Sequence, residues 1–334
     1  MAEVVAVDIG GTHARFAIAE VAGGKVLHLG PETTLKTAEH ASFQTAWEAF
    51  GAGLGRALPT AAAIAVAGPV QGEIIRFTNN PWIIRPALVD EKLGVERHVL
   101  INDFAAVGHA VAQAEPADFL HLCGPDTPLP GEGMIGVVGP GTGLGVAHVW
   151  RDARGYRVTA TEGGHIDFAP LDAIEDAILA RLRDRYTRVS VERVVAGPGL
   201  AEIHATLARL EGRAVLETDD KALWELAMSG SDSLAAAALD RFCLALGSVA
   251  GDLALAQGAS ATVIAGGLGY RIRDHLVRSG FAERYTAKGR FAGMMATLPV
   301  KLIVHPQPGL LGAAAAFAQA YQSSPERGGG ASQA

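Results

Sequence analysis

The sequence predicts an α/β protein built from two related domains, and three observations support this prediction. The chain has 334 residues, enough for about two domains of roughly 150 residues each. Short apolar strands alternate with helical patterns along the chain, which is typical of α/β folds. Residues 4–19 and 134–150 also share one pattern: an apolar strand, a glycine turn carrying a threonine, and a second apolar strand. This weak internal repeat indicates two similar halves.

The composition excludes several classes of protein. Hydrophobic residues make up 49% and charged residues 19%, so each half can bury a core and the whole chain is not disordered. The net charge of −7 argues against a nucleic-acid partner. The two cysteines, Cys123 and Cys243, are too few for a disulfide framework or a four-cysteine zinc site. No apolar run approaches 18 residues, and Glu3 and Asp8 are unlike a signal peptide, so we expect a cytoplasmic protein with no membrane partner.

In the first half of the chain, residues 4–8 and 14–19 read as a hairpin that bends over a glycine turn. A helix follows, because Phe43, Trp47, Phe50, Leu54 and Leu58 are spaced by three or four residues. The other elements expected here are two short strands and a helix, over residues 63–67, 99–101 and 104–114 respectively.

In the second half, strands are expected over residues 134–138 and 146–150, around a glycine turn at residues 139–145. The later elements are two helices, two strands and a final helix, over residues 174–186, 239–256, 262–265, 300–304 and 308–321. The glycine turns follow the carboxyl ends of strands, where open α/β sheets bind ligands.

The first glycine turn, Gly10-Gly11-Thr12, places backbone N–H groups beside the carboxylate of Asp8. Glycine N–H groups can approach phosphate oxygens closely, and the carboxylate can hold Mg²⁺ through water. Residues 139–145 form a second such turn. Each alone can be an ordinary hairpin turn, but together they suggest two loops that hold one polyphosphate. No P-loop sequence is present. The G-x-G-x-x-G pattern is also absent, since Leu144 stands where its third glycine belongs.

Three polar groups are candidates for binding a hydroxylated substrate. Asp103 follows Asn102 at the end of a strand and can accept a hydroxyl proton, although a helix N-cap is the alternative interpretation. Glu162 and His165 flank two glycines and offer an acceptor and a donor to vicinal hydroxyls, unless they form a polar surface turn. Taken alone, Glu192 reads as a first-turn glutamate and Asn79-Asn80 as a turn.

The order of several motifs resembles the bacterial glucokinase family of the actin-like ATPase and sugar kinase superfamily. The motifs are DIGGTHARFAIAE, FTNNPW, INDFAAV, GPGTGLGVAHV, EGGHIDFAP, VERVVAGPGL, IAGGL, KGRF and VHPQPGLLGAAA, and the resemblance covers residues 4–320. It implies a two-domain ribonuclease H-like fold of the hexokinase type with an interdomain cleft. The expected parts are a small α/β domain over residues 1–112 plus 307–321, a large α/β domain over 113–306, and a disordered tail over 322–334.

The resemblance also implies an activity, which is ATP-dependent phosphorylation of D-glucose at its 6-hydroxyl, the entry step of glycolysis. Asp103 is then the general base, and the sugar-binding residues are Asn79, Asn102, Asp103, Glu162, His165 and Glu192. The nucleotide-binding residues are Asp8, Ile9, Gly10, Gly11, Thr12, His13, Gly139, Gly141, Thr142, Gly143, Gly266, Gly267, Pro308, Gly309 and Leu310. Asp8 is the expected Mg²⁺ ligand, through water.

Two departures from the family pattern and several alternatives accompany this interpretation. His13 stands where asparagine is common, and the zinc-binding cysteine cluster of the related ROK kinases is absent, which implies the zinc-free branch. A homodimer is expected from the resemblance alone. The alternatives are a hexose kinase with different or broader specificity (mannose, fructose), a non-catalytic sugar sensor, or an actin-like or chaperone ATPase.

Overall fold

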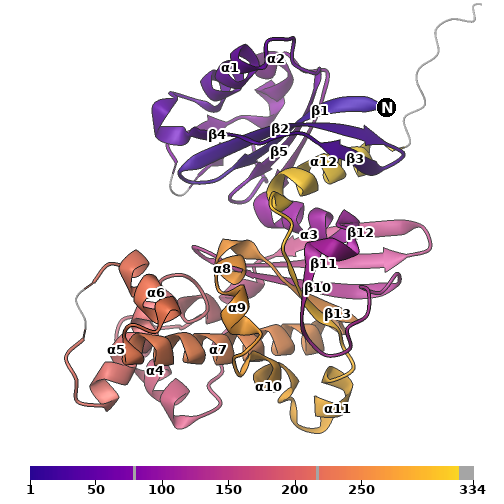
Figure 1. Cartoon of the computed structure of the whole chain (residues 1–334). Helices are drawn as coiled ribbons and strands as arrows, with labels where there is room; N and C mark the ends of the chain where they lie inside the picture. The colour runs from indigo at the N-terminus through magenta and orange to yellow at the C-terminus, as the bar shows by residue number, and fades with distance from the viewer. Residues whose placement is uncertain (78–79, 216–217, 323–334) are drawn as a thin grey trace, which may run out of the picture. The chain divides into compact units, whose positions relative to one another are not determined.

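The computed structural model describes residues 1–77, 80–215 and 218–322, and the chain divides into two compact units (Figure 1). Of the described residues, unit 1 comprises Met1–Ala114 together with residues 306–322, and unit 2 comprises Glu115–His305. Asn79 and residues 323–334 lie outside the described residues, so the predictions made for Asn79 and for the tail have no structural counterpart.

The sheet of unit 1 has the strand order β3-β2-β1-β5-β8, with β4 paired to β2. The predicted hairpin is present as antiparallel β1 and β2, whereas β1, β5 and β8 run parallel. Parallel pairing places Ile9 beside Val66 and Val66 beside Asn102, so three strands end at one edge. The strands are β1 (Ala2–Ile9), β2 (His13–Ala22), β3 (Lys25–Leu29), β4 (Thr33–Lys36), β5 (Ala61–Val66) and β8 (Arg97–Asn102), with a separate pair β6 (Ile75–Arg76) and β7 (Ile83–Ile84).

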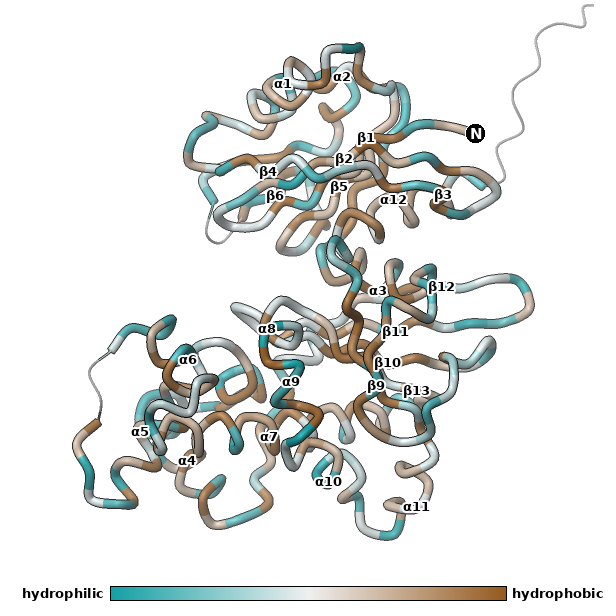
Figure 2. The backbone as a smooth tube through the Cα atoms, viewed as in Figure 1, coloured by the Kyte–Doolittle hydropathy of each residue, from teal (hydrophilic) through white to brown (hydrophobic). Residues whose placement is uncertain are grey.

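Alternating side chains of β1 direct its two faces toward two apolar layers. Val5, Val7 and Ile9 belong to the layer that includes α1 (Phe43–Leu54), while Val4 and Ala6 share a layer with α12 (Pro308–Ala320). Apolar residues concentrate on the buried strands and on α12 (Figure 2). The remaining helices of unit 1 are α2 (Val89–Leu93), α3 (Asp103–Gln113) and the 3-10 turns η1 (Thr37–Glu39) and η2 (Pro86–Leu88).

The predicted extension of the first helix to Leu58 is wrong. Helix α1 ends at Leu54 because Gly55 adopts the left-handed conformation that terminates helices. Leu58 nevertheless packs against the helix, since a Cβ added at Gly51 would lie 2.9 Å from its side chain. The apolar spacing therefore reflects the packing of Leu58 on α1, which continues after the helix has ended.

The sheet of unit 2 has the order β12-β11-β10-β13-β14-β9. Its first five strands repeat the arrangement of unit 1, with an antiparallel hairpin followed by parallel strands, and β9 adds an antiparallel edge. The internal repeat inferred from sequence thus corresponds to a repeated sheet topology. The strands are β9 (Phe119–Cys123), β10 (Gly133–Pro140), β11 (Leu144–Asp152), β12 (Gly155–Thr161), β13 (Ala261–Ile264) and β14 (Val300–Ile303).

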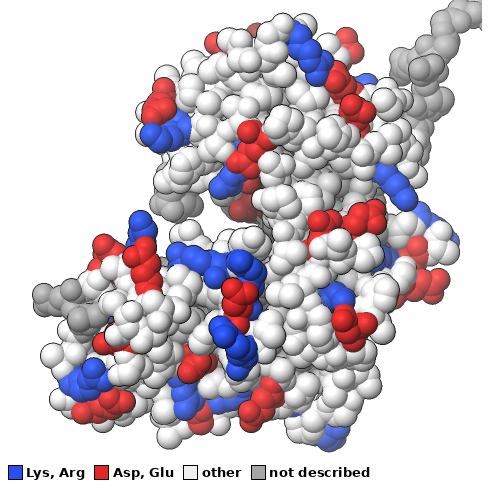
Figure 3. Space-filling view, viewed as in Figure 1, with Lys and Arg blue, Asp and Glu red and all other residues white. Residues whose placement is uncertain are grey.

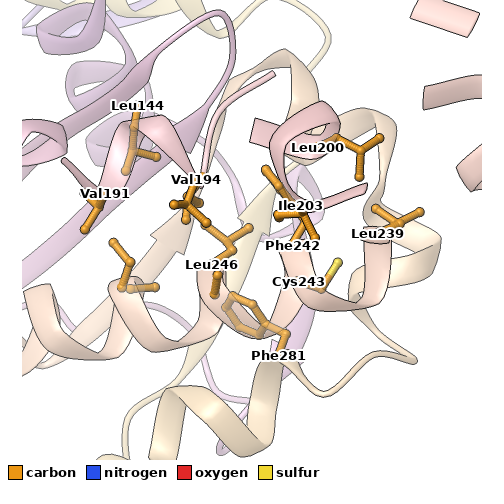
Figure 4. Close-up of a cluster of buried hydrophobic side chains, with 14 of the residues drawn as sticks. Leu144, Val191, Val194, Leu200, Ile203, Leu239, Phe242, Cys243, Leu246 and Phe281 are labelled. Atoms are coloured by element: carbon orange, nitrogen blue, oxygen red, sulfur yellow. The ribbon is translucent and has the colours of Figure 1, made fainter. Parts of the chain in front are cut away.

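Helix α7 (Ser233–Gln257) forms the centre of the large core of unit 2. Leu239, Phe242 and Leu246 of α7 point into one apolar cluster with Ile203 and Phe281 (Figure 4). The other helices are α4 (Ala173–Arg183), α5 (Gly199–Leu210), α6 (Asp220–Ser229), α8 (Gly266–Arg271), α9 (Arg273–Leu276), α10 (Phe281–Thr286) and α11 (Ala292–Met295), with 3-10 turns η3 (Pro116–Asp118), η4 (Gly163–His165), η5 (Val191–Arg193) and η6 (Gly289–Phe291). Tyr186, predicted to lie on the helix of residues 174–186, follows the end of α4.

By length and hydropathy, α7 is the one helix among the described residues that is able to cross a membrane. The sequence nevertheless has no uninterrupted apolar run of this length, because charged residues interrupt the helix at Asp240, Arg241 and Asp252. Of its apolar window, 72% is buried, as in the core helix of a globular unit.

Candidate functional site

The first glycine turn is fixed through its carbonyl groups. The Gly10 N–H donates to the His13 carbonyl at 2.9 Å, which closes the turn between β1 and β2. Thr37 holds two further carbonyls, donating from Oγ1 to Gly11 at 3.0 Å and from its N–H to Thr12 at 3.0 Å. The Thr12 hydroxyl lies 3.0 Å from Nδ1 of His13, so these two predicted site residues contact each other. The turn is thus held in one shape by the rest of unit 1.

Asp8 lies at the end of β1 in a partly buried position. Burial raises the pKa of its carboxyl, and the neighbouring Arg15 partly opposes that rise through an ion pair of 3.1 Å between Nη1 and Oδ2. A Cβ added at Gly309 would lie 2.7 Å from the same oxygen. The first turn of α12, which contains Pro308, Gly309 and Leu310, therefore lies directly against Asp8.

Asn102, rather than Asp103, caps helix α3. The Asn102 Oδ1 accepts the N–H groups of Phe104 at 2.8 Å and Ala105 at 3.1 Å, and its Nδ2 donates to the Gly68 carbonyl at 3.1 Å. The N-cap interpretation of Asp103 is therefore wrong. Asp103 is the first residue of the helix, half-buried, with its Oδ1 2.9 Å from the Phe104 N–H. Its carboxylate lies at the positive end of the helix dipole, at the carboxyl edge of the sheet.

The second glycine turn is shorter than the sequence analysis expected. Strand β10 continues to Pro140 and β11 begins at Leu144, so Gly139 is a buried strand residue and the turn itself is residues 141–143. Within it, the Gly141 N–H donates to the Gly143 carbonyl at 2.8 Å. The strands extend because antiparallel pairing of β10 and β11 persists up to the turn.

Gly266 and Gly267 are the first two residues of α8 and lie beside the second turn. Gly266 has a φ of +79°, and a Cβ added there would lie 2.6 Å from the Pro140 carbonyl oxygen. Only glycine tolerates this close approach together with that backbone conformation. The start of α8 therefore packs against the end of β10.

The two segments expected to bind sugar meet at the start of β11. Glu192 accepts the Leu144 N–H on Oε2 at 2.8 Å, and a Cβ added at Gly164 would lie 2.2 Å from the Leu144 carbonyl. The segments also pair directly, since the Val191 N–H donates to the Ile166 carbonyl at 2.9 Å. Glu192 and the 162–165 segment are thus neighbours within unit 2.

Glu162 and His165 face solvent. Their side chains are 82% and 55% exposed, and His165 Nε2 lies 3.9 Å from Glu162 Oε2, beyond hydrogen-bond distance. The intervening glycines are part of the single 3-10 turn η4. Exposed acceptor and donor groups at this spacing suit a polar ligand rather than a buried ion pair.

Glu192 also contacts the second glycine turn, a connection that sequence reasoning missed. A Cβ added at Gly143 would lie 2.5 Å from Glu192 Oε2. Any other residue at position 143 would therefore displace this carboxylate. The residue expected to bind sugar and the turn expected to bind phosphate are in direct contact.

Two further residues support the site and carried no assigned role. Arg15 forms an ion pair with Asp8. The two residues are directly opposite in the β1–β2 hairpin, so counting outward from the turn in the sequence predicts this pair. Gly197 donates its N–H to the Gly141 carbonyl at 2.8 Å. No local pattern announces this contact, because the two glycines are far apart in sequence.

Among the described residues, no group of three or more His, Cys, Asp or Glu side chains can hold a metal ion. Mg²⁺ is usually bound by one or two carboxylates together with water and substrate phosphates. The partly buried carboxylate of Asp8, beside the first glycine turn, fits that mode of binding.

Comparisons with known proteins match almost the whole chain to glucokinases. The family model described as glucokinase matches residues 5–320. The glucokinase of Zymomonas mobilis subsp. mobilis is 62% identical over 319 residues, which cover 96% of this chain and 98% of that protein. The glucokinase of Caulobacter vibrioides is 41% identical over 314 residues, or 93% of each chain.

Solved structures agree with the predicted fold class. A glucokinase from an Antarctic psychrotroph has a TM-score of 0.84 and 32% identity, covering 95% of this chain and 98% of its own. A ROK family glucokinase from Streptomyces griseus, solved with glucose and AMPPNP, has a TM-score of 0.60 at 20% identity and covers 93% and 98%. The prediction of an α/β sugar kinase fold is confirmed, and the chain belongs to the glucokinase family.

Proposed function

We propose that this chain is a glucokinase that transfers the γ-phosphoryl group of ATP to the 6-hydroxyl of D-glucose and so supplies glucose 6-phosphate to glycolysis. The observation that carries the proposal is that Asn102, and not Asp103, is the N-cap of α3. Asn102 satisfies the helix N-terminus with its own side chain, so Asp103 is not needed as a cap. A carboxylate placed at the carboxyl edge of a sheet is suited to accept a hydroxyl proton.

In this mechanism Asp103 takes the proton of the 6-hydroxyl as that oxygen attacks the γ-phosphorus. The bond between the γ-phosphorus and the β–γ bridging oxygen breaks, and ADP leaves. Phosphoryl transfer depends mainly on positioning and on charge neutralisation. The hydrogen bonds of Asn102 to the helix and to Gly68 fix the strand end from which Asp103 extends.

The nucleotide would be held by the two glycine turns, by Gly266 and Gly267, and by the first turn of α12. Mg²⁺ would be held by Asp8 through water and by the phosphates, and when bound it neutralises phosphate charge. The contact of Gly309 with Asp8 explains why α12, the last helix of the described chain, contributes residues to the same place as β1.

The sugar would be bound by Glu162, His165 and Glu192, with Asn79 and Asn102. One carboxylate oxygen of Glu192 accepts the Leu144 N–H, and this hydrogen bond fixes the orientation of the carboxylate. A site that pairs particular hydroxyls discriminates strongly against sugars that lack or invert them, because polar groups are then left unpaired.

Sugar choice and the role of Glu192 are tested together. With ATP, the purified protein is expected to phosphorylate glucose much faster than fructose or galactose in a coupled ADP assay. Glu192→Gln should reduce kcat/KM for glucose by about 1–3 kcal/mol, the scale of one charge-assisted hydrogen bond, and leave KM for ATP unchanged. Equal kcat/KM for glucose and galactose would instead identify a broader hexose kinase, and a fully active Glu192→Gln variant would remove Glu192 from the site.

Gly141→Val tests the second turn as a phosphate-binding element. A Cβ at Gly141 has room, since its nearest neighbour is the Gly143 carbonyl at 3.9 Å, so the fold should survive. The branched side chain would nevertheless obstruct close approach of phosphate, and KM for ATP should rise about 10-fold or more. Gly131→Val, in open space elsewhere in unit 2, is the control. If both variants show wild-type KM for ATP, the second turn does not bind phosphate.

We also propose that the two units are the two domains of the enzyme, with residues 306–322 belonging to the first, and that the enzyme is a cytoplasmic homodimer. The compactness of each unit supports the first statement, and the family resemblance supports the second. Sedimentation analysis of the purified protein measures the assembly directly.

A further inference from the structure

A buried tryptophan connects the second glycine turn to the surface of unit 2. Trp224, on α6, is only 2% exposed, and its Nε1–H donates to the Gly197 carbonyl at 2.9 Å. The Gly197 N–H in turn donates to the Gly141 carbonyl at 2.8 Å. The indole is therefore held in place two hydrogen bonds away from the turn.

Arg271 lies over this indole. Its guanidinium carbon is 5.1 Å from the centre of the Trp224 ring, within the range of a cation–π contact. Arg271 is also the last residue of α8, whose first residue, Gly266, packs against the Pro140 carbonyl beside the turn. Two chains of contacts, one through Trp224 and Gly197 and one along the six residues of α8, thus connect Arg271 to the second glycine turn.

The charge of Arg271 is not neutralised within the described chain. Several half-buried arginines of unit 2 pair with carboxylates, as Arg284 does with Asp172 and Glu175. No carboxylate oxygen of the described residues lies within 4.0 Å of the Arg271 guanidinium, and the residue is exposed. Basic side chains lie over α8 and α9, the helices that carry Arg271 and Arg273, with acidic side chains among them (Figure 3).

We propose that Arg271 binds phosphate oxygens of the nucleotide held by the second glycine turn; this inference rests on the proposed kinase function. A guanidinium that lies over an aromatic ring keeps its N–H edges available, and those edges match two phosphate oxygens at once. The contact with the indole also restricts the side chain before the ligand arrives, so less conformational freedom is lost on binding. Because the chain has a net charge of −7, an unpaired cation at the site reduces the repulsion of a polyanionic nucleotide.

The test compares Arg271→Ala, Arg271→Lys and the wild-type protein. Equilibrium binding of ADP is measured by calorimetry, together with KM for ATP and for glucose. Arg271→Ala should weaken ADP binding and raise KM for ATP by about 10-fold, with KM for glucose within about two-fold of wild type. Arg271→Lys should recover part of the loss, because it keeps the charge but not the planar fork.

Arg278→Ala is the matched control, since Arg278 is also exposed and its Nε donates only to the nearby Asp274 carbonyl. It should bind ADP like the wild type. Unchanged ADP affinity in Arg271→Ala would overturn the inference. An equal loss of affinity for adenosine, measured in the same way, would also overturn it, because the lost contact would then be to the nucleoside and not to phosphate. ADP binding does not depend on which sugar is phosphorylated, so wild-type protein that binds ADP without phosphorylating glucose would count against the proposed function alone.

Discussion

Replacing Asp103 by asparagine is expected to lower kcat by about 100-fold or more, the scale usual for loss of a general base. The substitution preserves the side-chain oxygen that lies 2.9 Å from the Phe104 N–H, so the first turn of α3 should remain intact. Helix capping is unaffected because it depends on Asn102. The variant is therefore expected to fold and to bind glucose but to lack the group that accepts the hydroxyl proton.

The measurement is steady-state kinetics with ATP and glucose, combined with thermal denaturation. Asp90→Asn serves as the control, because Asp90 is a 55% exposed carboxylate of the same unit that pairs with His98. This control should keep wild-type kcat. Near wild-type turnover in a folded Asp103→Asn variant would show that another group removes the proton.

Gly312→Ala is expected to have the largest effect on stability. Helices α3 and α12 pack so closely that a Cβ at Gly312 would lie 1.7 Å from the Ala106 carbonyl oxygen. A backbone carbonyl cannot rotate away, so the helices must separate, at a cost of about 3 kcal/mol. The loss of packing should exceed the gain in helix propensity of about 1 kcal/mol from replacing glycine by alanine.

Thermal denaturation should show a fall in Tm of roughly 5–10 °C for Gly312→Ala. Gly53→Ala is the matched control, since Gly53 lies within α1 of the same unit and a Cβ there meets nothing within 4 Å. Its Tm should equal or slightly exceed that of the wild type. If Gly312→Ala melts like Gly53→Ala, the close packing of α3 against α12 is not as described.

Regular hydrophobic periodicity accounts for the parts of the fold that the sequence predicted. Both hairpins and the long helix α7 were expected because alternation and three-to-four spacing extend over many residues. Helix ends were less predictable. Leu58 and Tyr186 continue an apolar pattern beyond α1 and α4, because side chains after a helix end can still pack on the same core.

The candidate site was predictable where its residues adjoin a strand end and not where they meet through the fold. Asp8 is the last residue but one of β1 and Asp103 follows β8, so the shared sheet edge places both on one side of unit 1. The contact of Glu192 with the Leu144 N–H and the bond between Gly197 and Gly141 join segments about 50 residues apart or more. No spacing rule relates such segments, and only their packing within unit 2 reveals the contacts.

The most direct test of the proposed function is identification of the product by phosphorus–proton correlation NMR after incubation with ATP and glucose. The account predicts a single sugar product in which phosphorus couples to the two protons on carbon 6, with one ADP formed per sugar phosphate. A phosphate on another sugar carbon, or inorganic phosphate as the only phosphorus product besides ADP, would contradict it.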